Sequence, residues 1–371
     1  MTDLNTRFLG LPLINPVVAA SGPWTGNAAR IQAAIDAGAG AVITETIALE
    51  EYHRCYPRVY YRDGEVMSTS LYGTLSLEQW ESEMEQIQKG SCKLIASIRG
   101  GTPSELAYIA KKVERMGADA LQLDLYAPVG SMIFGLNNDA EQLVSLVTAV
   151  KRECSIPIMV RLPHYVADNA RFMRALEKCG VDGITMIESI RCILGVDIDK
   201  AMPLMPTHGA YSGCHVRPIT LAAIAALSQV SNLPISATGG TEDYRNIVEA
   251  IELGATTVQL GSAVLLNGYS VITTAVEELS QWMNQHGYAN LQELQGKALK
   301  SLFSYEELDG TRRAAQIAHP QACTNCGLCI NSCLANAISF DEDGKLQVNV
   351  GICDGCGLCC SVCSHQVFCM A

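Results

Sequence analysis

Two short cysteine runs near the C-terminus restrict the fold of this chain more than any other feature of its sequence. Ten of the sixteen cysteines lie after residue 320, and eight of these form two copies of the spacing C-x2-C-x2-C-x3-C. The two copies are Cys323, Cys326, Cys329, Cys333 and Cys353, Cys356, Cys359, Cys363. This spacing is typical of bacterial ferredoxins with two [4Fe–4S] clusters. Zinc ribbons, in contrast, use paired C-x2-C motifs.

Each cluster in such a ferredoxin takes three thiolates from one run and the fourth from the other run. We therefore predict one cluster held by Cys323, Cys326, Cys329 and Cys363, and a second held by Cys353, Cys356, Cys359 and Cys333. The segments "AISF" and "KLQVNV" between the runs predict a small hairpin. Cys360 and Cys369 lie outside the pattern, and we expect them not to be ligands.

The composition limits the class of protein. The 371 residues are 49% hydrophobic and 17% charged, which is enough for a large globular core. We expect no secretory signal and no membrane span, because no basic segment precedes an apolar run at the N-terminus and no stretch has ~18 uninterrupted apolar residues. We therefore expect a cytoplasmic protein, and that compartment favours metal over disulfides. The net charge of −12 argues against nucleic-acid binding.

Before Lys300, eight apolar runs alternate with amphipathic stretches. The runs are Val17–Ser21, Ala41–Thr46, Lys93–Ile98, Ala120–Leu125, Ile156–Leu162, Gly183–Ser189, Leu233–Gly239 and Thr256–Ser262. Continuous apolar runs are typical of parallel strands buried on both faces, and stretches such as "SELAYIAKKVERMG" have helical periodicity. The segments "RMGADALQL" and "ELGATTVQL" belong to a weak repeat, in which a helix ends at glycine and the next strand begins.

Eight strand–helix units predict a (β/α)8 TIM barrel, which we place in residues 1–305, with a ferredoxin-like domain in residues 306–371. A doubly wound sheet is the alternative, but it would rarely need eight parallel strands with such a repeat. No G-x-G-x-x-G segment opens a helix after an early strand, so we expect no nicotinamide site in this chain. Electrons should then come from ferredoxin or from a separate NAD(P)H-oxidising flavoprotein subunit.

Glycines follow the seventh and eighth apolar runs. "ATGG" contains Gly239 and Gly240, and "QLGSA" contains Gly261 and Ser262. In a TIM barrel these two loops form the common phosphate site, because bare backbone N–H groups point at the anion. A redox cofactor with a phosphate beside a ferredoxin module is most simply FMN, which converts between one-electron and two-electron chemistry.

Several segments together resemble the FMN-dependent dihydroorotate and dihydropyrimidine dehydrogenases. They are "NPVVAASGP", "YSG", "LPISATGGTEDYRNIVEAIELGATTVQLGSA" and the terminal cysteine runs. The resemblance is greatest to the flavin-plus-ferredoxin portion of dihydropyrimidine dehydrogenase, and it covers essentially the whole chain. It implies hydride exchange between the reduced flavin and a ring C=C bond of a small-molecule substrate, and we expect a homodimer.

The resemblance also implies the residues that contact FMN. The backbone of Ala20, Ser21 and Gly22 would lie under the isoalloxazine ring. Glu45 and Arg161 occupy positions near the flavin where the family usually has lysine, and a cation such as Arg161 would stabilise reduced flavin. The phosphate would be bound by Gly213, Gly239, Gly240, Gly261 and Ser262.

The substrate side departs from the family pattern. The fourth strand of the family usually ends Asn-Leu-Ser-Cys-Pro, whereas this chain has Asp124 for the asparagine and Ala127 for the cysteine. Glu188 replaces a second asparagine. Ionised acids only accept hydrogen bonds, so the pocket should repel a carboxylated substrate such as orotate and favour N–H donors. Alternatively, Glu45 and Glu188 pair with Arg99 or Arg161 and do not touch substrate.

With that cysteine absent, another group must handle the proton. Asp124 itself, Tyr126 and His164 are the leading candidates, with Tyr211 and Cys55 as further ones, and the later loop "FGLNND" offers no cysteine. The favoured function is an oxidoreductase acting on a CH–CH or C=C bond of a nitrogen-containing ring. The alternatives are a dihydropyrimidine dehydrogenase catalytic subunit and an electron-transfer subunit with a non-catalytic barrel.

Overall fold

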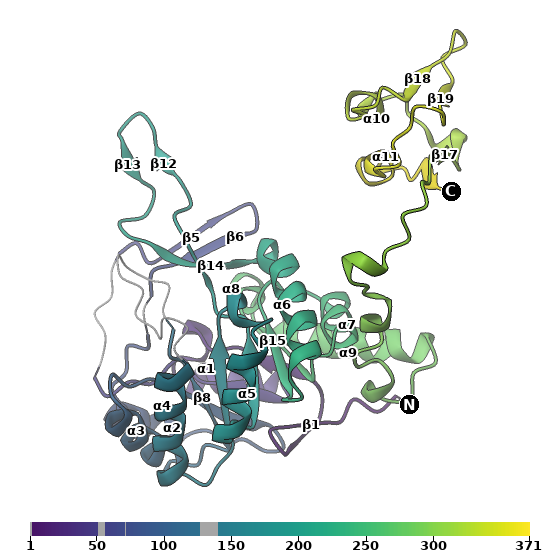
Figure 1. Ribbon diagram of the computed structural model, residues 1–371. Helices are drawn as coiled ribbons and strands as arrows, with labels where there is room; N and C mark the ends of the chain where they lie inside the picture. The colour runs from purple at the N-terminus through teal and green to yellow at the C-terminus, as the bar shows by residue number, and fades with distance from the viewer. Residues whose placement is uncertain (1, 51–55, 71, 127–139) are drawn as a thin grey trace. The chain divides into compact units, whose positions relative to one another are not determined.

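The computed structural model describes residues 2–50, 56–70, 72–126 and 140–371. The chain divides into two compact units, Met1–Leu302 and Phe303–Ala371. The first unit contains a barrel ringed by helices, and the second contains short strands and the cysteine runs (Figure 1). Within the described residues, no helix combines the length and the apolar character that crossing a membrane would require.

Eight parallel strands close the barrel of the first unit. In barrel order they are β10 (Gly183–Met186), β15 (Ile235–Thr238), β16 (Thr257–Leu260), β3 (Val17–Ala19), β4 (Ala41–Ile43), β7 (Lys93–Ile98), β8 (Ala120–Leu123) and β9 (Ile158–Leu162). Each strand lies within one of the eight predicted apolar runs, so the predicted TIM barrel is confirmed and the doubly wound alternative is wrong.

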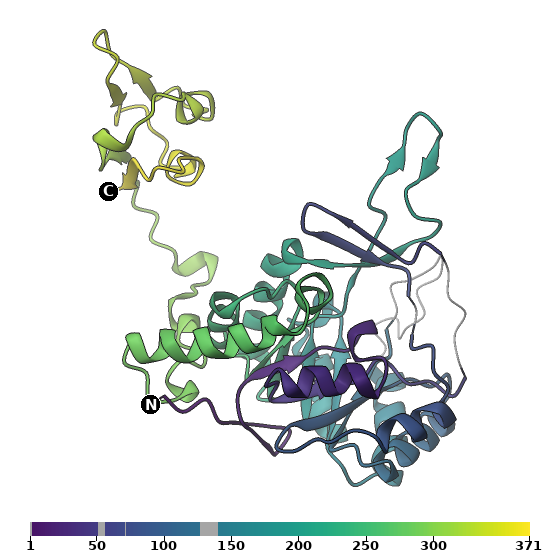
Figure 2. The ribbon, with the colours of Figure 1, turned by 180° about the vertical axis from the view of Figure 1, so that it is seen from behind.

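Helices follow the strands in sequence and surround the barrel (Figures 1 and 2). They are α1 (Ala28–Asp36), α2 (Leu77–Met84), α3 (Pro103–Arg115), α4 (Ala140–Glu153), α5 (Ala170–Cys179), α6 (Arg217–Val230), α7 (Tyr244–Glu252), α8 (Ser262–Asn267) and α9 (Ser270–Gln285). Helix α3 illustrates how the sequence sets their bounds. The Thr102 side chain accepts from Glu105 N at its start, and its apolar stripe, which includes Leu106, Ile109 and Val113, is buried.

The two ends of the barrel interior differ in polarity. A hairpin of β1 (Thr6–Phe8) and β2 (Leu11–Leu13) contributes Phe8, Leu9 and Leu13 to an apolar cluster with Val18, Ile43, Ile95, Ala120 and Met159. Buried polar side chains belong to the same barrel strands: Ser97, Gln122, Thr185, Ser236 and Gln259. Ser97, Gln122 and Gln259 lie near the carboxyl ends of their strands. In this fold the loops at that end of the barrel carry the chemistry.

A second sheet is built from the loops that follow β4 and β10. It is antiparallel, in the order β11 (Ile190–Cys192), β14 (Gly209–Gly213), β6 (Glu65–Ser68) and β5 (Val59–Arg62). A further hairpin of β12 (Val196–Asp197) and β13 (Met202–Pro203) projects beyond it (Figure 2). Short 3-10 helices complete the unit: η1 (Pro23–Thr25), η2 (His164–Val166), η3 (Cys214–Val216), η4 (Leu291–Glu293) and η5 (Ala298–Ser301).

The second unit has two similar halves. The predicted hairpin is present as β18 (Ile338–Phe340) and β19 (Leu346–Val348), while β17 (Ala315–Ile317) pairs with β20 (Phe368–Met370). Its helices are η6 (Tyr305–Glu307), η7 (Pro320–Ala322), α10 (Leu328–Asn331) and α11 (Leu358–Val362). Gly327 and Gly357 directly precede α10 and α11 with φ near +75°, a conformation that favours glycine.

Candidate functional site

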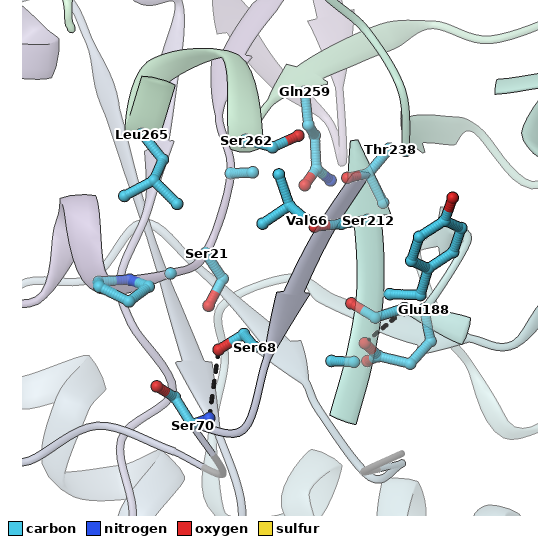
Figure 3. A pocket seen from close by; sticks show the side chains of 18 of the residues that line it. Ser21, Val66, Ser68, Ser70, Glu188, Ser212, Thr238, Gln259, Ser262 and Leu265 are labelled. Carbon is cyan, nitrogen blue, oxygen red and sulfur yellow. Dashed lines mark hydrogen bonds between the residues drawn. The ribbon is translucent and has the colours of Figure 1, made fainter. Parts of the chain in front are cut away.

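A cavity of about 160 Å³ lies at the carboxyl ends of the barrel strands. A single water needs roughly 10–15 Å³ on a comparable scale, so this space suits a ligand. Nine of the ten residues expected to contact FMN line it: Ala20, Ser21, Gly22, Glu45, Arg161, Gly239, Gly240, Gly261 and Ser262. Side chains of the second sheet, including Val66, Ser68 and Ser212, also line it (Figure 3).

The tenth residue, Gly213, does not line the cavity. It has a φ of +99°, and a Cβ there would lie 2.1 Å from the carbonyl oxygen of Gly64. Its glycine therefore permits close packing of β14 on the β5–β6 hairpin. Its neighbours Tyr211 and Ser212 do line the cavity.

The loops after β15 and β16 offer bare backbone to the cavity. At Gly240 the φ is +80°, and a Cβ would lie 2.7 Å from the backbone nitrogen of Arg217. At Gly239 the φ is +119°, and a Cβ would lie 2.5 Å from Thr220 Oγ1. Only glycine fits at both positions without strain. Ser262 and Leu265 lie on this side of the cavity, and Glu188 lies on the other (Figure 3).

Trp24 holds the loop that follows β3, Ala20–Gly22, in place. Its indole nitrogen donates a 2.7 Å hydrogen bond to the carbonyl oxygen of Ala20. A Cβ added at Gly22 would lie 2.4 Å from the Trp24 ring. The backbone of Ala20–Gly22 is therefore held in place at the cavity wall, where the Trp24 ring also lies.

Three charged side chains meet on the opposite side, from the ends of β8, β9 and β10. Arg161 Nε lies 3.0 Å from Glu188 Oε2, and Arg161 Nη1 lies 3.8 Å from Asp124 Oδ2. The closer contact is an ion pair that is not aligned as a hydrogen bond. Thr46 Oγ1 donates to Asp124 Oδ2 at 2.7 Å. The alternative in which Glu188 pairs with Arg161 thus matches this geometry, but Glu188 and Asp124 also line the cavity.

Two buried carboxyl groups share one guanidinium in this cluster. Burial raises the pKa of Glu188 to about 8, the Arg161 charge opposes that rise, and the Asp124 charge adds to it. Asp124 Oδ1 and Glu188 Oε2 have no hydrogen-bond partner among the described residues. Asp124 Oδ1 can accept a hydrogen bond, whereas a Glu188 carboxyl with a pKa of about 8 keeps its proton at neutral pH and has one O–H donor beside its acceptor. The cluster therefore suits a ring that has both an N–H and a C=O group.

Three tyrosines line the cavity: Tyr72, Tyr126 and Tyr211. The last two were predicted as candidates to handle the proton. Tyr126 is 4% exposed, its hydroxyl has no partner among the described residues, and burial raises its pKa above the usual range. Tyr211 donates to Glu65 Oε1 at 3.1 Å, and burial together with this bond raises its pKa to about 12. As the strand parity predicts, Tyr126 faces the same cavity as Asp124.

His164 is not among the residues that line the cavity. It begins η2 after β9, its ring packs edge-on to Tyr165 at 5.5 Å, and burial lowers its pKa. Cys55, Ala127 and the segment "FGLNND" lie outside the described residues.

Sequence reasoning missed the polar layer beneath the cavity. Gln122 and Gln259 are buried inside the barrel and hydrogen-bond to side chains of neighbouring strands. A signal was available, because each glutamine interrupts an apolar strand at the same place in the repeats "DALQL" and "TTVQL". Amides in fully buried strands need partners.

Two smaller cavities lie in the second unit, and each is lined by four cysteines. Cys323, Cys326, Cys329 and Cys363 line one of them, and Cys333, Cys353, Cys356 and Cys359 line the other. These are the two crossed sets that the spacing predicts. Cys360 and Cys369 line neither cavity. Among the described residues no group of three His, Cys, Asp or Glu side chains is arranged to hold a metal ion.

Backbone N–H groups point at several of these sulfurs. Ala315 N lies 3.5 Å from Cys353 Sγ, Ala337 N lies 3.3 Å from Cys333 Sγ, and Asn325 N lies 3.4 Å from Cys323 Sγ. Such contacts stabilise thiolates and tune the potential of iron–sulfur clusters. Phe340 and Phe368 line the first cavity together with Thr324 and His365, and Asp354 lines the second.

Comparison with known proteins gives the class. Residues 3–283 match the dihydroorotate dehydrogenase family. The chain is 31% identical over 305 residues to dihydroorotate dehydrogenase B (NAD(+)), catalytic subunit, of Pyrococcus abyssi, covering 80% of this chain and 99% of that protein. It is 27% identical over 354 residues to the NAD-dependent dihydropyrimidine dehydrogenase subunit PreA of Escherichia coli, covering 89% and 85%.

The chain therefore belongs to the dihydroorotate dehydrogenase family. It is a flavin-dependent oxidoreductase of the class that acts on CH–CH groups. The expected family and enzyme class are confirmed.

Proposed function

We propose that this chain is an FMN- and iron–sulfur-dependent oxidoreductase that acts on a CH–CH or C=C bond of a small nitrogen-containing ring, with electrons relayed through two [4Fe–4S] clusters. One observation carries the proposal: a glycine-lined barrel cavity occurs in the same chain as two cavities that each collect a predicted set of four cysteines. The family membership supports the flavin, and the match to PreA supports the wider assignment.

The residues of the barrel cavity fit FMN. Gly239, Gly240, Gly261 and Ser262 would hold the phosphate through backbone N–H groups. The backbone of Ala20–Gly22, which Trp24 braces, would support the flat ring. FMN, when bound, supplies hydride transfer and converts between two-electron and one-electron chemistry.

The charged side of the cavity would bind and orient the substrate. Asp124 Oδ1 is free to accept from a ring N–H, while Thr46 and Arg161 hold the other carboxylate oxygen. Tyr126 Oη is a buried hydroxyl that can hold the proton exchanged with the substrate carbon, because burial keeps it protonated at neutral pH. Tyr211, positioned by Glu65, is the second candidate.

The cysteine cavities fit two clusters, each with three thiolates of one run and one of the other. The Pyrococcus abyssi relative is the catalytic subunit of an NAD(+) enzyme, and PreA is a subunit of an NAD-dependent one. For this chain we infer that electrons are exchanged with ferredoxin or with a separate NAD(P)H-oxidising flavoprotein subunit. A homodimer and a cytoplasmic location remain predictions.

A dihydropyrimidine dehydrogenase catalytic subunit is the second candidate. The match to PreA covers 89% of the chain, a share too large for Met1–Leu302 alone. It therefore extends into the cysteine-rich unit. Uracil and thymine are neutral rings with N–H donors and C=O acceptors, which suits the acceptor of Asp124 and the protonated carboxyl of Glu188.

The cofactor assignment can be tested on anaerobically purified protein. We expect about eight iron atoms and one FMN per chain. Cys333→Ser and Cys363→Ser should each lose cluster absorbance and iron, because each changes one four-cysteine cavity. Cys360→Ser is the matched control and should keep its iron. Stoichiometric zinc, or equal iron loss in all three variants, would contradict the assignment.

The reaction can be tested by reducing the flavin chemically and following its reoxidation by uracil, thymine and cyclic enones. We expect at least one unsaturated ring to reoxidise it. NADH alone should not reduce the flavin, since the expected electron donor is another protein. Rapid bleaching of the pure chain by NADH would contradict that part of the proposal, and no reoxidation by any ring would favour the non-catalytic alternative.

A further inference from the structure

A chain of hydrogen-bonded side chains crosses the barrel interior beneath the cavity. Its members come from different strands and strand ends, and all are buried: Asp124, Thr46, Ser97, Gln122, Thr185, Gln259 and Ser236. Barrel interiors of this fold are usually packed with Val, Ile and Leu. Asp124, Thr46 and Gln259 line the cavity, whereas Ser97, Gln122 and Thr185 do not. This hydrogen-bond chain therefore connects two separate places on the cavity wall, Asp124 with Thr46 at one end and Gln259 at the other.

The first half of the chain begins at Asp124. Thr46 Oγ1 lies 2.7 Å from Asp124 Oδ2 and 3.0 Å from Ser97 Oγ. Gln122 Nε2 lies 3.2 Å from the same Ser97 oxygen. Each hydroxyl carries one hydrogen and accepts at its oxygen, so the partners determine which group donates.

The second half continues from the other end of the same amide. Thr185 Oγ1 lies 2.8 Å from Gln122 Oε1. Gln259 Nε2 lies 3.4 Å from Thr185 Oγ1 and 2.9 Å from Ser236 Oγ. If both amides were turned over, every bond from Thr46 to Gln259 could run in the opposite sense with the same heavy-atom distances.

Asp124 removes this ambiguity, because an ionised carboxylate can only accept. The Thr46 hydroxyl must donate its hydrogen to Asp124, so the Ser97 hydroxyl must donate to Thr46 Oγ1. Gln122 must then turn its NH2 group to Ser97.

The same logic continues to the far end. The Gln122 carbonyl oxygen receives the Thr185 hydrogen. Because the Thr185 hydrogen is already donated to Gln122, Thr185 Oγ1 can only accept from Gln259. Gln259 must therefore turn its NH2 group toward Thr185. The carbonyl oxygen of Gln259 makes none of these hydrogen bonds, which all involve its Nε2.

We infer that the charge of Asp124 sets the sense of this chain and that Gln259 thereby offers its carbonyl oxygen to the cavity as an acceptor for an N–H group of the flavin ring. Thr185 is the positioning residue, since it joins the two halves without touching the cavity. The inference rests on the proposed function, because it names FMN as the ligand. Hydrogen bonds aligned head to tail in a dry interior strengthen one another.

The test compares two buried threonines of the barrel interior. Thr185→Val removes the central hydroxyl at nearly constant shape. Thr257→Val is the matched control, because Thr257 lies on the same strand as Gln259 and its hydroxyl has no partner among the described residues. Thr185→Ser restores the hydroxyl. Each variant of the full chain is stripped of FMN and titrated with FMN by fluorescence quenching, and its flavin absorption spectrum is recorded.

We expect Thr185→Val to bind FMN about tenfold more weakly, the loss expected for one hydrogen bond, with a shifted flavin band. Thr257→Val and Thr185→Ser should stay within about twofold of the wild type. Equal FMN affinity and an unchanged spectrum in Thr185→Val would overturn the inference alone. An equal loss in Thr257→Val would overturn it too, because packing would then be the cause. A wild-type chain that does not bind FMN would overturn the proposed function and the inference with it.

Discussion

The two sides of the barrel cavity recognise ligands by different means. The side formed by the loops after β15 and β16 uses backbone, and its defining residues, Gly239 and Gly240, have no side chains to offer. The side formed by the ends of β8, β9 and β10 uses charged side chains, of which Arg161 and Glu188 lie 3.0 Å apart. The first side is fixed by steric necessity, whereas the second depends on a balance of charges.

This difference implies that cofactor binding and substrate choice can change separately. The glycine side matches the segments that carry the resemblance to the family, and its glycines offer backbone N–H groups, not charged side chains, to the cavity. The charged side carries the departures from the family pattern, Asp124 and Glu188. Because the glycine loops and the charged cluster belong to different strands, substrate preference can diverge while the loops proposed to bind phosphate are retained.

The largest effect should come from breaking the glycine side. Gly240→Ala would place a Cβ 2.7 Å from the backbone nitrogen of Arg217 at a φ of +80°, so the loop must move. We expect FMN to be lost on purification and turnover to fall by more than about 100-fold, because a displacement of about 1 Å can cost that much. The measurement is the FMN content per chain together with activity.

A matched control separates backbone strain from displacement of the loop. Gly268 also has a positive φ, +79°, but a Cβ there would meet nothing within 4 Å. Gly268→Ala should therefore lose some stability but keep its FMN. Equal FMN loss in both variants would mean that strain alone explains the result, and the contrast between the two sides would disappear.

On the charged side, Asp124→Asn should lower kcat/KM by about thirtyfold, which corresponds to ~2 kcal/mol of transition-state binding. An amide replaces one acceptor by a donor and weakens the hold on a substrate N–H. FMN and iron should remain stoichiometric at assay concentrations, because the glycine loops and cysteines are unchanged and the amide oxygen of the asparagine can still accept from Thr46. Full activity would make Asp124 structural, and loss of flavin would place it on the cofactor side.

The glycine side of the cavity could be predicted from the sequence, whereas the contacts of the charged side could not. Continuous apolar runs and glycines after the seventh and eighth of them predict a barrel and its phosphate loops, because strand burial and turn geometry are local properties. Cysteine spacing likewise predicts which four cysteines line each small cavity, since this spacing is typical of ferredoxins in which the two runs cross.

Contacts between segments that are far apart in the sequence were harder to predict from the sequence. The Thr46–Asp124 bond joins residues 78 positions apart, and the Glu188–Arg161 pair depends on how neighbouring strand ends meet. Gly213 was predicted to contact phosphate, yet its positive φ serves the packing of β14 against Gly64. A positive-φ glycine in a loop has the same sequence signature whether it faces a ligand or another strand.

A smaller effect should distinguish carboxylated from neutral rings. Orotate should bind at least about tenfold more weakly than uracil, because like charges brought together without solvent are strongly unfavourable. Dihydroorotate should not reduce the bound flavin at a useful rate. The measurement is perturbation of the flavin absorption during titration with each ring. Asp124→Asn should narrow the gap, and equal affinity for both rings in the wild type would contradict this view of the charged side.

The smallest effect is a pH dependence of stability that belongs to the charged side alone. The pKa of Glu188 is raised to about 8 in the folded protein by burial, from the usual glutamate value of about 4.3 when unfolded. Between these values the folded state holds more protons than the unfolded state, so Glu188 makes stability fall as pH rises through this window. Glu188→Gln cannot ionise, and it should remove this part of the decline.

We expect the Tm difference between pH 5.5 and pH 8.5 to be smaller in Glu188→Gln by at least about 2–4 °C, the shift for about 1 kcal/mol, measured on the intact chain with its cofactors. Glu249→Gln is the control, since Glu249 pairs with Arg217 at the surface and both side chains are about two-fifths exposed. An exposed pair contributes little, so its variant should follow the wild-type pH profile. If Glu188→Gln also follows that profile, the Glu188 carboxyl is ionised across this range. The charged side would then carry two negative charges beside Arg161 even in the free protein, and its preference for N–H donors would be stronger than proposed.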